Sequence, residues 1–501
     1  MQQILLSDYL LQRLDPGSGE PRNHRLYLLI REAIADARLV AGTRLPTSRE
    51  LAADLGIARN TILYAYEQLR AEGYVEARVG SGTYVARTTP DESLLVGARA
   101  VKPAPRSAEA TLSHRGRNIV ENTRASAQQW GAFMPGVPDI EAFPFALWNR
   151  LTEKQWRQPK ARNLTYGWGG GHPDLKRAIA RHLNTARAVV CEPEQILVTD
   201  GIHQAIHLCV HLLTDVRNRA WVEDPGYWGI RKVVSALGVE LVPVPVDREG
   251  LAPSPEDMRR PPRLIFVTPS HQYPLGHVMS LARRRMLIEY AQRHNAWIVE
   301  DDYDSEFRYS GRPLAALQGL EPHAPVLYAG TFSKTMFPGL RLGYLVLPAE
   351  LVQPFQLALA DLYREGRWMD QAVMAEFIEE GHYAAHIRRM RLLYGRKRAL
   401  LRDAVARHIP QATLLSADSN AGLHLAIGLP PEVSDRDVAA RAQAQGLVSL
   451  PLSRYYMRPE VEGEARQGLV LGYGGVPEGQ IEPMLRRLAG LIPDGPVHLP
   501  G

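Results

Sequence analysis

The stretch "VLYAGTFSKTMFPGLRLGYLVLP", residues 326–348, decides the fold because it sets charged side chains between two apolar runs. Its apolar ends, 326–328 and 342–347, are short and typical of buried strands. The turn between them carries the amine of Lys334 and the guanidinium of Arg341. A lysine after a buried strand can have a lowered pKa and attack a carbonyl compound as a nucleophile. The stretch therefore predicts a chemically active lysine at the end of a core strand.

The totals bound the class of protein. The chain has 501 residues and a formal net charge of +5, which predicts two or three domains and permits nucleic-acid binding without arguing for it. Its two cysteines, Cys191 and Cys209, give no disulfide framework or metal cluster and fit a reducing cytoplasm. The first residues, "MQQILLSDYLLQRLD", are too short and too acidic for a secretory signal, and no apolar run approaches the ~20 residues that span a bilayer. We expect a cytoplasmic protein with no membrane partner and no metal.

Residues 24–87 predict a compact α+β unit of three helices and a hairpin. Stretches 24–39, 47–56 and 58–73 have apolar residues at helical spacing, and a glycine ends each of the last two. Thr47 or Ser48 is the expected N-cap of the second helix. The stretch "YVEARVGSGTYVA" alternates around a Gly-Ser-Gly turn, which is a hairpin signal. The inward faces are Leu26, Leu29, Ile30, Ala33 and Ile34 in the first helix, and Ile62, Tyr66 and Leu69 in the third.

This unit closely resembles the GntR family through "TRLPTSRELAADLGIARNTILYAYEQLRAEGYVEARVGSGTYV", which implies an N-terminal winged helix-turn-helix DNA-binding domain. The outward face of the third helix can reach base edges and phosphates from the major groove. Arg49 can hold the DNA backbone, and two glycines let the wing tip approach a phosphate. An interaction module with a solvated basic face is the alternative. The expected DNA-binding residues are Arg49, Arg59, Asn60, Thr61, Tyr64, Gly80 and Gly82.

The remaining chain divides into a linker and a larger domain. Residues 88–130 mix Pro, Ala, Ser and Arg without periodicity, which favours a linker whose arginines are solvated or help to hold DNA. Residues 131–495 alternate short apolar runs with amphipathic helices, which predicts an α/β body with a parallel or mixed sheet covered on both faces. Chemistry in such sheets gathers in loops at the carboxyl ends of the strands.

Those loops hold the parts of one cofactor site. Asp301 can keep a ring nitrogen protonated, and the phenol of Tyr303 can bond a ring oxygen. The helix that begins after Gly201 offers free N–H groups to an anion, and Arg341 adds a second grip on a phosphate. Tyr227 offers a flat face for stacking. With Lys334, these groups describe a pyridoxal 5′-phosphate (PLP) site.

The arrangement resembles fold-type I PLP-dependent aminotransferases over roughly residues 131–495. By that resemblance, Lys334 carries the internal aldimine, Asp301 pairs with the pyridine nitrogen, Tyr303 contacts the ring oxygen and Tyr227 stacks on the ring. Tyr166 matches the tyrosine that reaches the phosphate of the partner subunit, which implies a homodimer. The phosphate is surrounded by Gly201, Ile202, His203, Ser333 and Arg341.

A GntR-type head fused to an aminotransferase-like body resembles the MocR/GabR-type subfamily of GntR transcriptional regulators. The resemblance implies a PLP-dependent, DNA-binding transcriptional regulator that binds a double-stranded operator. Its effector would be an amine, an amino acid or a B6 vitamer, sensed through an aldimine at Lys334. One alternative is an active aminotransferase with an appended DNA-binding domain, and another is a regulator with a vestigial cofactor site.

Two motifs depart from the expected pattern. Leu275 in "HQYPLG" replaces a small hydroxylated residue, and either His271 or Gln272 could stand for the asparagine that aminotransferases turn toward the ring oxygen. Residues 470 and 471 are Val and Leu where a late arginine clamps the substrate carboxylate of aminotransferases. Arg454 and Arg466 are two possible substitutes. A weak carboxylate grip fits an effector other than an ordinary α-amino acid.

Overall fold

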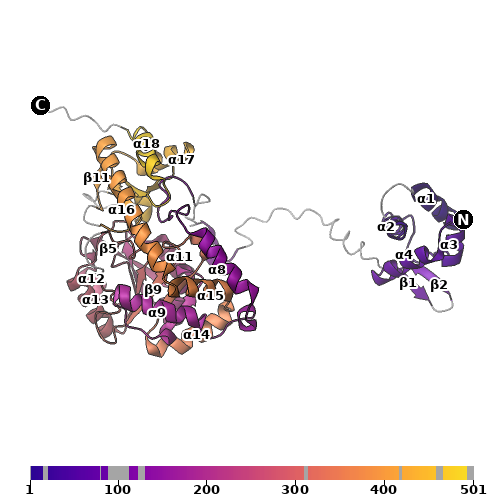
Figure 1. Cartoon of the computed structure of the whole chain (residues 1–501), viewed down its shortest axis with the longest axis horizontal. Helices are drawn as coiled ribbons and strands as arrows, with labels where there is room; N and C mark the ends of the chain where they lie inside the picture. The colour runs from indigo at the N-terminus through magenta and orange to yellow at the C-terminus, as the bar shows by residue number, and fades with distance from the viewer. Residues whose placement is uncertain are drawn as a thin grey trace. The chain divides into compact units, whose positions relative to one another are not determined.

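The structure, a computed structural model, separates the chain into two compact units, Met1–Ser113 and His114–Gly501 (Figure 1). No helix in the described part of the chain is long and apolar enough to cross a membrane. The expected linker, 88–130, lies mostly outside the described residues, which within it include helix α7 (His114–Glu121). The described residues are 2–14, 21–78, 81–87, 112–121, 130–309, 314–416, 420–458 and 466–493.

The first unit has the winged helix-turn-helix fold that the sequence predicts. Its helical core buries the expected inward faces, with Leu26, Ile30, Ile62 and Leu69 all at 0% exposure. The two strands pair antiparallel. The elements are α1 (Gln2–Arg13), α2 (Arg22–Ala35), α3 (Ser48–Leu55), α4 (Arg59–Ala71), β1 (Val75–Arg78) and β2 (Gly82–Val85).

Local signals explain the helix boundaries in this unit. Thr47, rather than Ser48, is the N-cap of α3: its hydroxyl accepts the Glu50 N–H while the Glu50 side chain accepts the Thr47 N–H. Gly56 ends the same helix in the left-handed conformation, with φ 62°. Helix α1 lies outside the predicted 24–87 unit, yet it buries Leu10 in the same hydrophobic core.

A mixed eight-stranded sheet forms the centre of the second unit, as the alternating pattern predicts. Its order is β3-β10-β9-β8-β7-β4-β5-β6, and β4, β5, β7, β8 and β9 are parallel. Strand β10 is antiparallel to both neighbours, so β3 points the same way as the parallel strands. The strands are β3 (Ile196–Thr199), β4 (Arg219–Asp224), β5 (Glu240–Asp247), β6 (Gly250–Leu251), β7 (Leu264–Val267), β8 (Trp297–Asp302), β9 (Val326–Thr331) and β10 (Gly343–Val346).

Helices cover both faces of this sheet because successive strand residues point to opposite sides. In β8, Val299 packs into the cluster that contains α10 and α11, whereas Ile298 packs into the cluster that contains α13. The helices before and beside the sheet are α8 (Phe145–Arg157), α9 (Pro173–Arg187), α10 (Ile202–Leu213), α11 (Trp228–Ala236), α12 (Pro255–Arg259), α13 (Leu281–His294), α14 (Ala349–Tyr363) and α15 (Trp368–Glu379).

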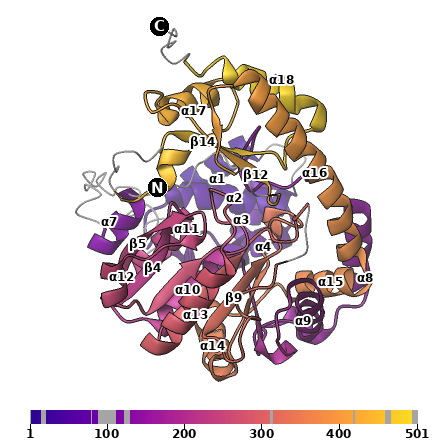
Figure 2. The same cartoon turned by 90° about the vertical axis from the view of Figure 1, so that its left-hand side faces the viewer.

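A smaller antiparallel sheet, in the order β11-β12-β14-β13, forms the C-terminal part of the second unit. The long helix α16 (His382–His408) runs from the region of the large sheet to this part (Figure 2). The remaining elements are β11 (Thr413–Leu414), β12 (His424–Gly428), α17 (Asp435–Ala444), β13 (Leu450–Pro451), β14 (Gly468–Gly472) and α18 (Glu478–Ala489).

Candidate functional site

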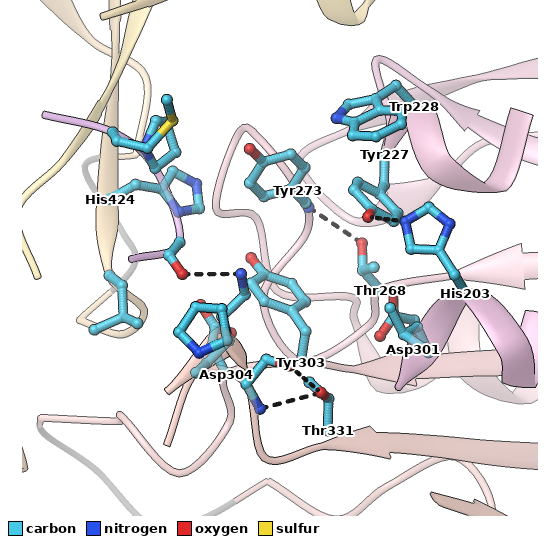
Figure 3. A pocket seen from close by; sticks show the side chains of 18 of the residues that line it. His203, Tyr227, Trp228, Thr268, Tyr273, Asp301, Tyr303, Asp304, Thr331 and His424 are labelled. Atoms are coloured by element: carbon cyan, nitrogen blue, oxygen red, sulfur yellow. Dashed lines mark hydrogen bonds between the residues drawn. The ribbon is translucent and has the colours of Figure 1, made fainter. Parts of the chain in front are cut away.

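The sequence-predicted residues meet in a cavity of about 320 Å³ at one edge of the large sheet (Figure 3). Strands β3, β4, β7, β8 and β9 all end at this edge, so the loops that follow them converge. A segment before α8 and residues of the small sheet complete the wall. The expected site residues that line the cavity are Ile202, His203, Tyr227, Asp301, Tyr303, Ser333, Lys334 and Arg341.

Lys334 lies three residues after β9, in the turn whose apolar flanks form β9 and β10. Its Nζ donates a hydrogen bond of 2.9 Å to the carbonyl oxygen of Gly136. Burial lowers the pKa of Lys334, and the carboxylates of Asp304 and Asp301 oppose that change. A buried amine with a lowered pKa is a better nucleophile than a solvated lysine.

Asp301 is the penultimate residue of β8, rather than a residue after the strand as the sequence suggested. Its Oδ1 is buried and has no hydrogen-bond partner among the described residues. Burial, helped by the nearby Asp302 and Glu223, raises the pKa of Asp301 to about 8. An unpaired buried carboxylate costs free energy unless a cation or a donor reaches it. The cavity therefore offers a place for a protonated ring nitrogen.

The start of α10 presents backbone N–H groups and a nearby guanidinium to the cavity. Gly201 has φ 92° and precedes the first helical N–H groups, which Ile202 and His203 carry into the cavity wall. A Cβ added to Gly201 would lie 3.5 Å from the guanidinium of Arg341, so this cation lies close to the helix start. Ser333 adds a hydroxyl, bonded at 3.1 Å to that of Thr331.

Tyr227 places its ring on the wall, and its hydroxyl lies 2.7 Å from Nε2 of His203. This contact holds one end of the ring in place. Tyr166 is different: it is 75% exposed and does not line the cavity of its own chain. Its position is compatible with the predicted role toward a second subunit.

In the loop after β7, the hydrogen bonds identify His271, rather than Gln272, as the residue that contacts a side chain of the site. The Gln272 amide donates to the carbonyl oxygens of Pro225 and Tyr273, both at 2.8 Å, and its Oε1 accepts the Leu275 N–H. Gln272 thus holds the turn. Nδ1 of His271 lies 3.0 Å from the hydroxyl of Tyr303, although neither His271 nor Gln272 lines the cavity.

Residues 452–458, which we call the strap, extend from the small sheet and bring an arginine to the cavity. The short helix η4 (Leu452–Tyr455) carries Arg454, one of the two candidate anion-binding arginines, into the wall. The fully buried carboxylate of Asp435 accepts the N–H of Ser453 at 2.8 Å and its hydroxyl at 2.7 Å. These bonds hold the start of the strap.

The end of the strap is held by Asp224, the last residue of β4. Its carboxylate accepts the N–H groups of Met457 and Arg458 at 2.7 and 3.2 Å, and the Arg458 guanidinium at 3.0 Å. Arg466, the other candidate, does not line the cavity. It donates to the Arg458 carbonyl oxygen at 2.7 Å and lies over the ring of Tyr456.

Several wall residues were missed by sequence reasoning. Gly136 belongs to "AFMPGVPDIEAFPFALW", but nothing local shows that its carbonyl meets a lysine 198 positions later. His424 reaches the site from the small sheet. Tyr273 lies in the loop after β7, in which only His271, Gln272 and Leu275 were expected to matter. Its hydroxyl lies 2.9 Å from that of Tyr455. Only Tyr273 had a usable signal, an aromatic residue in a strand-end loop.

Two histidines and one carboxylate near the wall also have the composition of a metal site. One nitrogen or oxygen each from His271, Asp304 and His424 lies within 4.8 Å of the others. The contact between His271 and Asp304 is 2.9 Å, a hydrogen-bond distance. Burial lowers the pKa of His424 to about 3, so its ring is neutral.

In the first unit, the expected DNA-binding residues that the structure describes are exposed or partly exposed. Arg49 is exposed at the start of α3, and Arg59 donates to the Ser48 hydroxyl at 3.2 Å. Gly82 has φ 119°, and a Cβ there would lie 3.0 Å from Nε of Arg44, a basic residue that sequence reasoning missed. Asn60, Thr61 and Tyr64 lie on the first turns of α4, with Tyr64 37% exposed, and Gly80 lies outside the described residues.

The description "Bacterial regulatory proteins, gntR family" matches residues 23–85, and "Aminotransferase class I and II" matches residues 148–466. The probable rhizopine catabolism regulatory protein MocR of Rhizobium meliloti is 41% identical over 92% of this chain and 92% of its own length. This chain belongs to the MocR family of GntR-type regulators.

Other comparisons agree with the MocR-family architecture. The HTH-type pyridoxine biosynthesis transcriptional regulator PdxR of Corynebacterium glutamicum is 32% identical, covering 92% of this chain and 94% of its own. A multiple substrate aminotransferase from Thermococcus profundus matches with a TM-score of 0.67, covering 77% of this chain and 98% of that one. At 23% identity, that likeness supports the fold alone. As a MocR-family member, the chain is an HTH-type transcriptional regulator with a fold-type I aminotransferase body.

Proposed function

We propose that this regulator binds PLP through Lys334 and alters its DNA binding when a primary amine or a B6 vitamer reaches the cavity. The observation that carries the proposal is a pair of complementary groups in one cavity. Lys334, whose side chain is partly buried, lines the same cavity as Asp301, whose Oδ1 has no hydrogen-bond partner among the described residues. An amine suits an aldehyde, and a buried carboxylate suits a protonated ring nitrogen.

The remaining wall residues fit the same cofactor. When bound, PLP supplies an aldehyde that reversibly takes up primary amines. The free N–H groups at the start of α10 suit its phosphate, because a helix N-terminus attracts anions. Asp301 would hold the ring nitrogen, Tyr303 the ring oxygen, Tyr227 the ring face, and Gly201, Ile202, His203, Ser333 and Arg341 the phosphate.

The partners follow from the two units and from one exposed loop. Residues 24–87 would bind a double-stranded operator through α4 and the wing. Tyr166 and Trp168 are 75% and 66% exposed, which is unusual for large aromatic residues. The residues that follow them in the loop are held in place, because the Glu365 carboxylate accepts the Gly170 N–H at 2.8 Å. A homodimer, with Tyr166 reaching the phosphate of the second copy, would cover this loop.

A spectrum followed by chemical trapping tests cofactor binding. Purified protein titrated with PLP should develop a visible band, and borohydride reduction should fix the cofactor on the peptide that contains Lys334. 4-Aminobutyrate, taurine and the alanines should then be added, as well as excess PLP, because these amines and the vitamer are the proposed effector classes. No band, or labelling of another lysine, would refute the proposal.

An active aminotransferase is the second candidate, and one observation favours it. The cavity contains the lysine, the carboxylate and the phenol together with Arg454, a cation that could hold a substrate carboxylate. Turnover distinguishes the two functions. Accumulation of a keto product over many cycles identifies an enzyme, whereas a spectral change that stops after one equivalent of amine identifies a sensor.

A further inference from the structure

One imidazole nitrogen in the wall is shared by two neighbours. Nδ1 of His271 lies 2.9 Å from Oδ2 of Asp304 and 3.0 Å from the hydroxyl oxygen of Tyr303. Tyr303 and Asp304 line the cavity (Figure 3). His271 lies in the turn after β7 and does not line it. His271 and Asp304 are each 2% exposed, so no bulk water reaches the contact.

A single Nδ1 cannot donate to one neighbour and accept from the other at the same time. The carboxylate of Asp304 has no hydrogen to offer when ionised, and it is the stronger acceptor, so the Nδ1 hydrogen goes to Asp304. His271 then has no lone pair at Nδ1 to take the phenol hydrogen of Tyr303. That hydrogen remains available to a group inside the cavity.

The other ring nitrogen agrees with this tautomer. Nε2 of His271 has no hydrogen-bond partner among the described residues. A Cβ added to Gly276 would lie 3.1 Å from this atom, so the backbone closes over it. A hydrogen on Nε2 would be a buried donor without an acceptor, which is costly. A hydrogen on Nδ1 and none on Nε2 avoids that cost.

We infer that Asp304 and His271 are positioning residues that reserve the phenol hydrogen of Tyr303 for the ring oxygen of the cofactor. The inference rests on the proposed function. Because Gln272 is occupied by the turn, the loop acts on the cofactor through Tyr303 rather than directly. The other titratable groups that face this relay are Asp301, Asp302, Glu223, Glu306, Tyr273, Lys334 and His424, and the four variants of the test retain all of them.

The test measures how the visible band of the full chain loaded with PLP changes with pH. With cofactor bound, a hydrogen bond from Tyr303 would stabilise the ionised ring oxygen and so favour the unprotonated form of the cofactor bound to Lys334. Loss of the bond should therefore raise the pH midpoint of the band. A shift of about one pH unit is expected, since one hydrogen bond has roughly that free energy.

Four variants separate the relay from simple packing. His271→Leu leaves the Asp304 carboxylate without its Nδ1 donor. Since Oδ2 of Asp304 and the Tyr303 hydroxyl lie 2.9 and 3.0 Å from that nitrogen, the carboxylate then competes for the phenol hydrogen, and the midpoint should rise as it should in Tyr303→Phe. The double variant should match Tyr303→Phe, because His271 acts only through the phenol. His271→Asn is the matched control: its amide N–H can take the place of the Nδ1 hydrogen, so its midpoint should stay near that of the wild type.

The outcomes are distinct. A wild-type midpoint in His271→Leu, or an extra shift when it is added to Tyr303→Phe, would overturn the inference. Absence of any band in the wild-type protein would instead refute the proposed function. If His271→Leu does not fold, Asp304→Asn decides: loss of a nearby negative charge alone lowers the midpoint, whereas loss of the relay raises it. A rise supports the relay, and a fall or no change contradicts it.

Discussion

The amine of Lys334 donates its hydrogen bond to the carbonyl oxygen of Gly136, 198 positions earlier in the chain and 2.9 Å away. Gly136 has φ 74°, and a Cβ built on it would lie 2.6 Å from that amine. The segment before α8 therefore closes over the lysine with a glycine, because a larger residue would occupy the place of the amine.

Gly136→Ala should lower PLP affinity at least tenfold, since the new methyl group displaces the Lys334 amine. Gly381→Ala is the matched control: its φ is 81°, similarly strained, but nothing lies within 4 Å of its Cβ. Both variants should lose about 1 kcal/mol of unfolding free energy from backbone strain. Equilibrium dialysis measures the affinity. Equal cofactor affinity in the two variants would show that the clash at Lys334 is unimportant.

Without cofactor, the contribution of Asp301 to the free energy of unfolding should fall as pH rises from about 4 to about 8. Burial raises the pKa of Asp301 to about 8, and an unfolded aspartate titrates near 4. The folded state holds the extra proton in that window, so the free energy of unfolding falls as pH rises through it. Asp301→Asn should remove a few kcal/mol of this fall (~1.4 per pH unit). Urea unfolding at pH 5 and pH 8 measures this difference in unfolding free energy for both proteins. An equal difference in the wild-type protein and in Asp301→Asn would contradict the prediction.

In the first unit, Arg59→Ala should weaken binding to DNA from upstream of the gene by about 1–3 kcal/mol, through lost contacts at the groove. Arg70→Ala is the control, because Arg70 is also exposed on α4 but lies in its last turn. Fluorescence anisotropy at several salt concentrations measures both. Equal losses in the two variants would mean that α4 binds DNA, if at all, through general charge.

Asp224→Asn removes a buried charge that holds two backbone N–H groups and a guanidinium at the end of the strap. The free energy of unfolding should therefore fall by about 2–4 kcal/mol, as urea unfolding would measure.

The strap should control the binding of the effector rather than that of the cofactor. Arg454→Ala should reduce the affinity of an anionic effector and leave PLP affinity unchanged. Arg466→Ala should do neither, since Arg466 lies away from the cavity. Effector titrations of the visible band decide between the two arginines.

Much of this architecture could be predicted because its signals are local. The strand-turn-strand stretch around Lys334 and the helical spacing around Ile62 need only neighbouring residues. The convergence of Asp301, Tyr227 and Lys334 follows from parallel strands that end at one edge. Helix α1 was missed because its role depends on packing against a core built by later helices.

The rest depends on contacts between distant segments. The roles of His271 and Gln272 were left open because both are polar residues of one loop, and only the Asp304 and Pro225 contacts separate them. Arg454 could not be preferred to Arg466 from sequence, because neither sits at the usual position. The strap that places Arg454 is fixed by two buried carboxylates: Asp435, 18 positions before Ser453, and Asp224, 233 positions before Met457.

The most direct measurement compares DNA binding by the wild-type protein and Lys334→Ala, each with PLP and each with the amine that changes the wild-type spectrum. We predict that both bind the same DNA fragment, because Lys334 is not part of the first unit. The amine should change the affinity of the wild-type protein and leave that of Lys334→Ala unchanged. An equal response in Lys334→Ala would contradict sensing through the lysine.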